Sequence, residues 1–439
     1  MIRILKYGEV DVQEIFDRAV PETDVEAAVT EIIENVRKNA DKAILEYAER
    51  FDHAKLDSLL VTEEEIDEAI ASVEPEFLSI LKKAAENIRA FHEKQKRNSF
   101  ILNEKEGVVL GQKVMPVERA GLYVPGGTAA YPSTVLMDSI PARIAGVKEI
   151  CITTPPDSKG KIHPEILAAA KIAGVDRIYK VGGAQAIAAL AYGTETIHKV
   201  DKIVGPGNAF VAEAKKQVFG KVAIDMIAGP SEILIVSDGK MNPAYTAADM
   251  LSQAEHDRMA SAVLVTDDMD FARAVQAELE KQIPQLIRAD IARASIDRNG
   301  KIIVADSIDA VIDIANEIAP EHLELCLDNP FDYLDKVRNA GSVFLGRNCP
   351  EALGDYFAGP NHTLPTGGTA RFSSPLSVDD FIKKTQFIYY TKDALSKVAE
   401  DVAFFANKEG LTGHAKSAII RTEDVMSIII TDYIGKMTV

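Results

Sequence analysis

The chain has 439 residues, of which 47% are hydrophobic and 26% charged, and its formal net charge is −18. The length exceeds what one hydrophobic core supports and predicts two or three domains, while the composition is that of a soluble globular protein. The negative charge argues against a nucleic-acid partner, because phosphate binding requires a basic face.

The sequence carries no signal for a membrane or for export. No apolar run approaches the roughly eighteen residues of a membrane span, and the first residues lack the apolar core of a secretory signal. The three cysteines, Cys151, Cys326 and Cys349, are widely spaced, which favours a reducing compartment over a disulfide framework. We therefore expect a cytoplasmic protein with no membrane contact.

Residues 1–115 are predicted to form an N-terminal, mostly helical region. Residues 25–37 and 75–96 place apolar side chains at three- and four-residue spacing, as on one face of a helix. From residue 107 the pattern becomes strand-like and leads into a glycine-rich loop at 121–127.

Residues 116–236 alternate between short apolar strands and helices. Strands are predicted at 149–153, 177–181 and 202–204, and helices at 163–173, 184–191 and 209–219. Such an alternation predicts βαβ units and a mostly parallel sheet. We expect a first Rossmann-like domain here, on the side of a nucleotide.

Residues 237–375 repeat the alternation and are predicted to form a second Rossmann-like domain. After an apolar run at 233–236, helices are predicted at 243–256, 271–282 and 308–318, and strands at 262–266, 301–305 and 342–345. The predicted fold class is therefore α/β, with two doubly wound parallel sheets.

The last part of the chain has no such pattern. Residues 347–375 are rich in glycine, proline and asparagine, and a loop of this length is usually functional. Residues 376–439 read as a tail with a helix near 394–407 and with enough apolar side chains to require a packing partner, for which a second subunit is one candidate.

Two glycine turns precede predicted helices in the first alternating region. Gly182 and Gly183 follow a predicted strand and stand before Gln185, and a second turn, residues 205–208, ends in Asn208. Glycines at a helix N-terminus let phosphate oxygens approach free N–H groups. The complete Gly-x-Gly-x-x-Gly fingerprint is missing, so a tight strand-to-helix turn is an equally good interpretation.

Gln253 and His256 suggest half of a metal site. They lie three residues apart on a predicted helix at 243–257 and would share a face, offering an amide oxygen and an imidazole nitrogen. Taken alone, such a pair is more often a solvated polar face. The other half of the site is expected in the segments that contain Asp355 and His414.

Glu321 and His322 are candidates for acid–base chemistry. Pro320 ends the preceding helix, so both side chains fall at the end of an element, where they can project into a cleft. Histidine is the commonest general base and glutamate can activate water. From these residues alone, a surface glutamate beside a histidine that caps a turn is the commoner arrangement.

Taken together, these motifs resemble those of the histidinol dehydrogenase family, nearly from end to end. The ordered set is far more specific than any one member. It comprises GLYVPGG (121–127), VGPGN (204–208), IAGPSE (227–232), LSQAEHD (251–257), APEHL (319–323), GDY (354–356), GPNH (359–362) and EGLTGHA (409–415).

The resemblance implies oxidation of L-histidinol through L-histidinaldehyde to L-histidine, the last two steps of histidine biosynthesis, with NAD as oxidant and one zinc ion per site. It implies two incomplete Rossmann-like domains, N-terminal helices that pack on the second of them, and a tail exchanged in a homodimer whose subunits share the active site. By the same resemblance the zinc ligands are Gln253, His256, Asp355 and His414. The substrate also contacts Ser231, His322, His362 and Glu409, and the NAD contacts are Tyr123, Gln185 and Asn208.

Elementary chemistry agrees with this assignment. Oxidation of an alcohol requires a base for the hydroxyl proton, for which His322 is the candidate, and oxidation of the aldehyde requires an activated water, for which Glu321 is the candidate. Zinc would orient the substrate between the two steps.

Three other functions remain open at this stage. A zinc hydrolase would use the same ligands without NAD, and an aldehyde dehydrogenase of the cysteine type would need Cys326 or Cys349. A binding protein with two α/β lobes would convert nothing.

Overall fold

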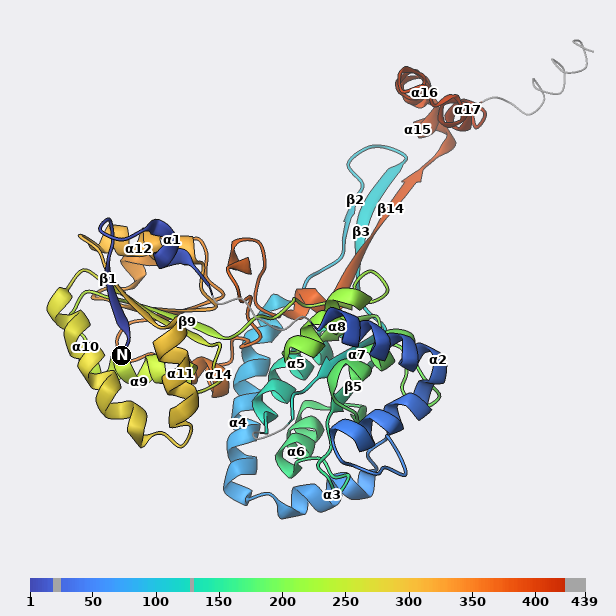
Figure 1. Cartoon of the computed structure of the whole chain (residues 1–439). Helices are drawn as coiled ribbons and strands as arrows, with labels where there is room; N and C mark the ends of the chain where they lie inside the picture. Colours follow the sequence, from blue (N-terminus) through green and yellow to red (C-terminus); the bar gives the residue numbers. More distant parts are fainter. Residues whose placement is uncertain (19–24, 127–129, 423–439) are drawn as a thin grey trace, which may run out of the picture. The chain divides into compact units, whose positions relative to one another are not determined.

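The computed structural model describes residues 1–18, 25–126 and 130–422 (Figure 1). The chain divides into two compact units. The first consists of Met1–Lys96 and Pro116–Phe381, and the second of Arg97–Met115 and Ile382–Val439.

The first unit contains a five-stranded parallel sheet in the order β6-β5-β4-β7-β8. Its strands are β4 (Arg119–Tyr123), β5 (Glu149–Thr154), β6 (Arg177–Lys180), β7 (Lys202–Val204) and β8 (Ala223–Ile224). Its connecting helices are α5 (Pro132–Ala145), α6 (Pro164–Ala173), α7 (Gly183–Tyr192) and α8 (Ala209–Val218). The strand order runs outward in both directions from the β4–β7 pair, which makes this pair the topological switch point of the sheet.

Successive strand residues face opposite sides of this sheet and build two apolar cores. Leu122 and Ile152 belong to the core beneath α5 and α6, whereas their neighbours Tyr123 and Cys151 belong to the core beneath α7 and α8. The predicted parallel α/β architecture is confirmed for this half.

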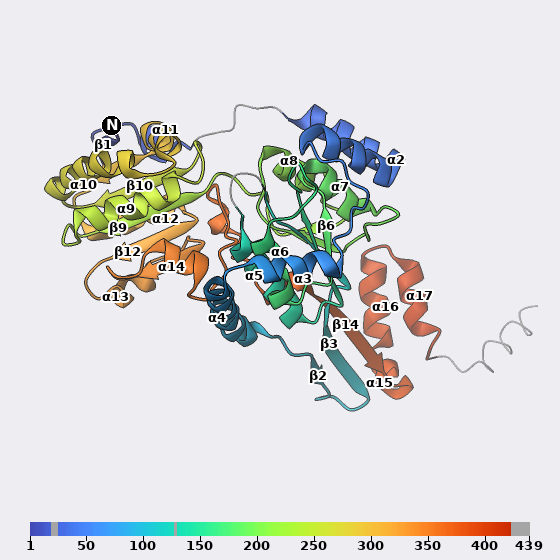
Figure 2. The same cartoon turned by 90° about the horizontal axis from the view of Figure 1, so that it is seen from below.

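The N-terminal helices pack mostly against the helices that flank this first sheet (Figure 2). Helix α2 lies on α7 and α8, α3 on α6, and α4 on α5, where α4 buries an apolar stripe that includes Leu81 and Ile88. These helices are α2 (Glu26–Phe51), α3 (Glu63–Ser72) and α4 (Pro75–His92), and the short 3₁₀ helix η1 (Glu93–Gln95) follows α4. The expectation that they pack on the second half of the chain is therefore not met by α2, α3 and α4. Only the first sixteen residues, which contain β1 (Arg3–Lys6) and α1 (Val12–Phe16), pack on the second sheet.

The first unit also contains a six-stranded parallel sheet in the order β1-β11-β10-β9-β12-β13. Its strands are β1 (Arg3–Lys6), β9 (Glu232–Ser237), β10 (Ser261–Thr266), β11 (Lys301–Val304), β12 (His322–Cys326) and β13 (Ser342–Leu345). Figure 1 shows α1 and α12 on one face and α9, α10 and α11 on the other.

The helices around the second sheet differ in length. They are α1 (Val12–Phe16), α9 (Pro243–Ala254), α10 (Met269–Gln282), α11 (Ala289–Asn299), α12 (Ile308–Ile318), α13 (Phe331–Leu334) and α14 (Glu351–Tyr356), with 3₁₀ helices η2 (Ile283–Gln285), η3 (Thr369–Arg371) and η4 (Val378–Phe381).

Several elements of this half were not predicted, and two of them, β12 and α14, carry site residues. Strand β12 is buried along its whole length although it carries His322 and Glu324, and such polar residues hide a central strand from a search for apolar runs. Helix α14 falls within the segment that was expected to be a loop.

In the second unit, β2 (Phe100–Leu102), β3 (Val108–Pro116) and β14 (Ile382–Tyr390) form a three-stranded sheet in the order β14-β3-β2, with β2 and β3 antiparallel. Helices α15 (Lys392–Ser396), α16 (Ala399–Lys408) and α17 (Thr412–Ile419) follow, and α16 packs along α17 (Figure 2). Within the described residues, no helix is both long and apolar enough to cross a membrane.

Candidate active site

His322 stands at the centre of a group of acidic side chains at the start of β12. Its Nε2 lies 3.8 Å from Asp355 Oδ1 and 3.9 Å from Glu351 Oε1. Ligand atoms of these three residues all lie within 4.8 Å of one another. Glu351 and Asp355 reach His322 together because they are four residues apart on α14 and share a helix face.

A backbone contact determines the tautomer of His322. Its Nδ1 lies 2.9 Å from the carbonyl oxygen of Glu232, which only accepts hydrogen bonds, so Nδ1 carries the proton. Burial lowers the pKa of the imidazole, which favours the neutral ring. Nε2 therefore presents a free lone pair to the carboxylates, as a general base or a metal ligand requires.

Glu321 lies beside His322 and is fully enclosed. Its Oε2 accepts a hydrogen bond of 2.8 Å from the Glu232 N–H and lies 3.7 Å from His322 Nδ1. Burial raises the pKa of Glu321 well above its usual range, and the nearby carboxylate of Glu232 adds to the effect. A carboxylate in such a position is a stronger base than one in water.

Gln253 and His256 are adjacent to this cluster, although not on one helix as predicted. Helix α9 ends at Ala254 and His256 lies in the following turn, where its N–H bonds to the carbonyl of Gln253 at 3.1 Å. Ser252, next to Gln253, donates to Glu351 Oε2 at 2.9 Å, which ties the end of α9 to α14.

Three buried polar atoms in this region have no hydrogen-bond partner among the described residues. They are Gln253 Oε1, His322 Nε2 and Glu351 Oε1. Leaving such atoms unpaired is unfavourable, and burial, followed by the Glu351 carboxylate, also raises the pKa of Asp355 well above its usual range. Imidazole nitrogen with carboxylate and amide oxygens is a donor set that suits zinc, and a divalent cation would satisfy Gln253 Oε1 and offset the crowding of the carboxylates.

His362 and Ser231 border the same cluster. His362 Nδ1 lies 3.8 Å from Asp355 Oδ1, its Nε2 is 3.4 Å from Thr134 Oγ1, and burial lowers its pKa to about 4. Ser231 directly precedes β9, which pairs with β12 at His322. The predicted substrate residues of the first unit thus lie around the starts of two neighbouring strands.

Two predicted site residues belong to the second unit. Glu409 caps the C-terminus of α16 and His414 lies in the first turn of α17, and both are exposed. Three of the four predicted zinc ligands therefore lie in the first unit, and His414 lies in the second.

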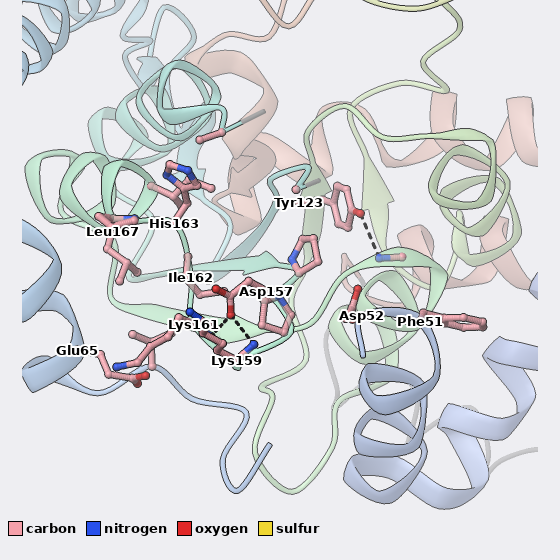
Figure 3. A pocket seen from close by; sticks show the side chains of 18 of the residues that line it. Phe51, Asp52, Glu65, Tyr123, Asp157, Lys159, Lys161, Ile162, His163 and Leu167 are labelled. Carbon is pink, nitrogen blue, oxygen red and sulfur yellow. Dashed lines mark hydrogen bonds between the residues drawn. The ribbon is translucent and has the colours of Figure 1, made fainter. Parts of the chain in front are cut away.

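A cavity of about 980 Å³ lies in the first unit and is lined by all three predicted NAD residues, Tyr123, Gln185 and Asn208 (Figure 3). Segments that follow β4, β5, β6 and β7 contribute to its wall, among them Gly126, Pro155, Gly183 and Asn208. The cavity thus lies at the carboxyl ends of parallel strands beside the switch point, where open α/β sheets bind ligands.

The two glycine turns form part of the cavity wall. The Gly183 N–H donates to the Tyr123 hydroxyl at 3.1 Å, and Gly183 has a φ of +65° at the start of α7. Asn208 caps α8 by accepting hydrogen bonds from the N–H groups of Phe210 and Val211 at 3.1 and 3.2 Å. Both turns bring helix N-termini to the cavity, as binding of phosphate groups requires.

The cysteines are poorly suited to nucleophilic catalysis. Cys151 and Cys326 are buried, and burial raises the pKa of both thiols, while Cys349 is half-buried and its pKa is also raised by burial. A reactive thiol needs a lowered pKa. The environment therefore disfavours the cysteine-type aldehyde dehydrogenase.

Two residues of the cluster and the cavity, Glu351 and Asp52, were absent from the predicted set. Glu351 belongs to the His322 cluster, and its four-residue spacing from Asp355 after Pro350 is a helix signal that was available in the sequence. Asp52 lines the cavity from the end of α2, and no sequence pattern connects it to residues beyond position 120.

Comparison with known proteins agrees with this geometry. A family model described as histidinol dehydrogenase matches residues 17–422. The chain is 53% identical to the histidinol dehydrogenase of Clostridium acetobutylicum over 426 residues, which cover 96% of this chain and 99% of that protein. It is 56% identical to that of Geobacillus kaustophilus over 396 residues, which cover 90% and 93% of the two chains.

A solved structure shows the same fold. The crystal structure of histidinol dehydrogenase from Elizabethkingia anophelis superposes with a TM-score of 0.91 at 42% identity, and the match covers 96% of this chain and 98% of that one.

Proposed function

Since the chain belongs to the histidinol dehydrogenase family, we propose that it oxidises L-histidinol through L-histidinaldehyde to L-histidine, the last two steps of histidine biosynthesis. The observation that carries the proposal is the neutral, buried His322, whose free Nε2 faces two carboxylates. A base of this kind suits the removal of a proton from an alcohol.

NAD is the proposed hydride acceptor, held in the cavity by Tyr123, Gln185 and Asn208. The support is the position of the cavity beside the switch point of the first sheet and the helix N-termini at its wall. A single cavity of this kind suits two NAD molecules used in succession.

His322 and Glu321 divide the proton transfers between them in this proposal. His322 Nε2 takes the hydroxyl proton of histidinol in the first oxidation. Glu321 then takes a proton from the water that adds to the aldehyde, so that the hydrate can lose its hydride in the second oxidation. The position of Glu321 beside His322, with Oε2 held by the Glu232 N–H, supports this role.

We assign the metal position to Gln253, His256, Asp355 and His414 of the partner subunit, with Glu351 beside it. When bound there, zinc would hold the imidazole and amine of histidinol and so orient the reacting carbon. Ser231, His362 and Glu409 would complete the contacts with the substrate.

A homodimer that shares its active sites explains why the site residues divide between two units. The second unit exposes large apolar side chains on β14 and α16, including Ile388, Tyr389, Phe404 and Phe405. Exposed apolar patches of this kind mark interfaces. The exchange of residues 382–439 between subunits would cover them and bring His414 and Glu409 to the site.

The proposed location of the protein is the cytoplasm. The three free cysteines are consistent with the cytoplasm, where such thiols stay reduced. The hydrolase and binding-protein alternatives lose weight because the family model and the relatives that match this chain are described as histidinol dehydrogenases.

The test is the formation of NADH from excess NAD and limiting L-histidinol, with and without a chelator. Two NADH per histidinol, lost on chelation and restored by zinc, are expected. One NADH per histidinol would remove the aldehyde step from the proposal, and none from zinc-loaded protein would favour the hydrolase or the binding protein.

A further inference from the structure

One carboxylate on the cavity wall has no assigned role. Asp52 follows the last residue of α2 and lines the cavity next to Phe51, and Figure 3 shows Asp52 and Tyr123 on the same part of its wall. Tyr123 in turn accepts the hydrogen bond from Gly183 at the start of α7, which places Asp52 close to the glycine turn.

Among the cavity carboxylates, Asp52 differs from the others because one of its oxygens, Oδ2, lacks a hydrogen-bond partner in the part of the chain that the structure describes. Asp157 accepts hydrogen bonds from the N–H groups of Lys159 and Lys161 at 2.8 and 2.9 Å. Glu65 pairs with Lys180 at 2.6 Å and Glu68 with Lys161 at 3.2 Å.

Asp52 Oδ2, in contrast, is enclosed and has no hydrogen-bond partner among the described residues. A buried acceptor without a donor is unfavourable, and because Asp52 lines the cavity, its carboxylate can turn to a donor on a ligand bound there. Burial raises the pKa of Asp52 to about 6, so the group remains an anion at neutral pH.

We propose that Asp52 accepts hydrogen bonds from the hydroxyls of the adenosine ribose of NAD and thereby selects NAD over NADP. The inference rests on the proposed function, because it assumes that the cavity holds the dinucleotide. Asp52 reaches the cavity from the end of α2, and a carboxylate that faces a bound dinucleotide can accept hydrogen bonds from ribose hydroxyls, as acidic residues do in dinucleotide-binding folds.

The negative charge of Asp52 also explains why NADP would bind more weakly than NAD. The 2′-phosphate of NADP would replace a hydroxyl donor by a dianion close to an anionic acceptor. The complex would then lose a hydrogen bond and gain a like-charge repulsion in a partly enclosed space.

The experiment measures dissociation constants of NAD, NADP and 2′-deoxyadenosine NAD by calorimetry, using the zinc-loaded full-length protein and Asp52→Asn. Asparagine keeps the size of the side chain but removes the charge. We expect Asp52→Asn to bind NAD about tenfold more weakly, to discriminate against NADP at least about tenfold less, and to show a smaller difference between NAD and its 2′-deoxy analogue than the wild type does.

Glu49→Gln is the matched control, because it removes an exposed carboxylate from the same end of α2 and should leave all three constants unchanged. A thermal melt of each variant checks folding. If Asp52→Asn keeps the NAD affinity and the discrimination of the wild type, or weakens NAD and NADP equally, the inference is wrong. If the wild type itself binds no NAD, the proposed function fails instead.

Discussion

At the scale of single residues, the chemistry of the candidate site depends on one backbone carbonyl. The Glu232 carbonyl holds the proton of His322 on Nδ1, and the N–H of the same residue holds Glu321 Oε2. Both side chains are therefore oriented by the first residue of β9, which pairs with β12. Such anchoring matters because general bases act only within hydrogen-bond reach of the proton.

Glu321→Gln tests the proposed division of roles. Glutamine keeps an oxygen to accept the Glu232 N–H, so the fold should persist, but it cannot take a proton from water. The first hydride transfer should proceed at nearly the rate of the wild type, whereas the second should slow about a hundredfold. Single-turnover NADH formation separates the two steps, and an equal loss of both would refute the assignment.

Asp138 provides a pH-dependent stability test. This residue of α5 is fully buried, accepts a hydrogen bond from Thr363 Oγ1 at 2.8 Å, and has a pKa that burial raises to about 8. Between about pH 4 and pH 8 the folded protein therefore binds a proton that the unfolded chain releases, so this group favours the folded state less and less as the pH rises.

Asp138→Asn should remove that dependence, because asparagine resembles the protonated acid. Its free energy of unfolding, relative to the wild type, should increase from pH 5 to pH 8 by an amount on the order of 3 kcal/mol. Denaturant titrations at several pH values measure the difference. A difference that stays constant with pH would show that Asp138 is ionised in the folded protein.

At the scale of elements, a buried ion pair stabilises the turn between β7 and α8. Lys215 pairs with Asp225 and donates to the Gly205 carbonyl at 3.0 Å, while Asp225 Oδ2 accepts the Gly205 N–H at 2.8 Å. Breaking such a pair leaves an uncompensated buried charge. The turn that ends in Asn208 is therefore rigid where it meets the cavity.

Gly205→Ala should disturb this turn and weaken NAD binding. Gly205 has a φ of +112°, and an added Cβ would lie 2.2 Å from the Tyr123 carbonyl oxygen, so the turn must move. We expect NAD affinity to fall by about tenfold or more and the melting temperature to decrease.

Gly220→Ala is the control for backbone strain alone. Gly220 has a similar φ of +95°, but nothing lies within 4 Å of the added Cβ. This variant should lose stability without losing NAD affinity. Equal losses of affinity in both variants would argue against a specific role for the β7–α8 turn.

The elements that the sequence predicted correctly share a local cause. Strands β5, β6 and β7 and helices α6, α7 and α8 are short segments that bury apolar residues and alternate along the chain, so their positions follow from short-range pattern. Strand β12 was not predicted because its polar residues interrupt the apolar run. Helix α14 was not predicted because it lies in a segment rich in glycine, proline and asparagine, where the helix signal after Pro350 was overlooked.

At the scale of the whole molecule, the proposed site requires parts of two units. Asp355 lies in the first unit and His414 in the second. If the second unit is exchanged in a dimer, Asp355→Ala and His414→Ala should each abolish activity, but hybrid dimers would retain one intact site.

Mixing the two inactive variants and allowing subunits to exchange should therefore restore about a quarter of the wild-type activity, since half of the dimers are then hybrids with one intact site each. Activity and zinc content are measured before and after exchange. No recovery, despite hybrids detected by mass, would mean that both ligands come from one chain. A protein that lacks residues 382–439 should likewise fail to retain zinc.

The sequence by itself determined the parallel α/β class, most strands and helices, and, through its ordered motifs, the family to which the chain belongs. Periodicity and motifs act over a few residues, so they are visible along the chain. Only the tertiary structure decided that α2, α3 and α4 cover the first sheet, that Glu351 joins His322, and that Asp52 reaches the wall of the cavity. These facts depend on side chains far apart in sequence that pack together, and no local pattern encodes such contacts.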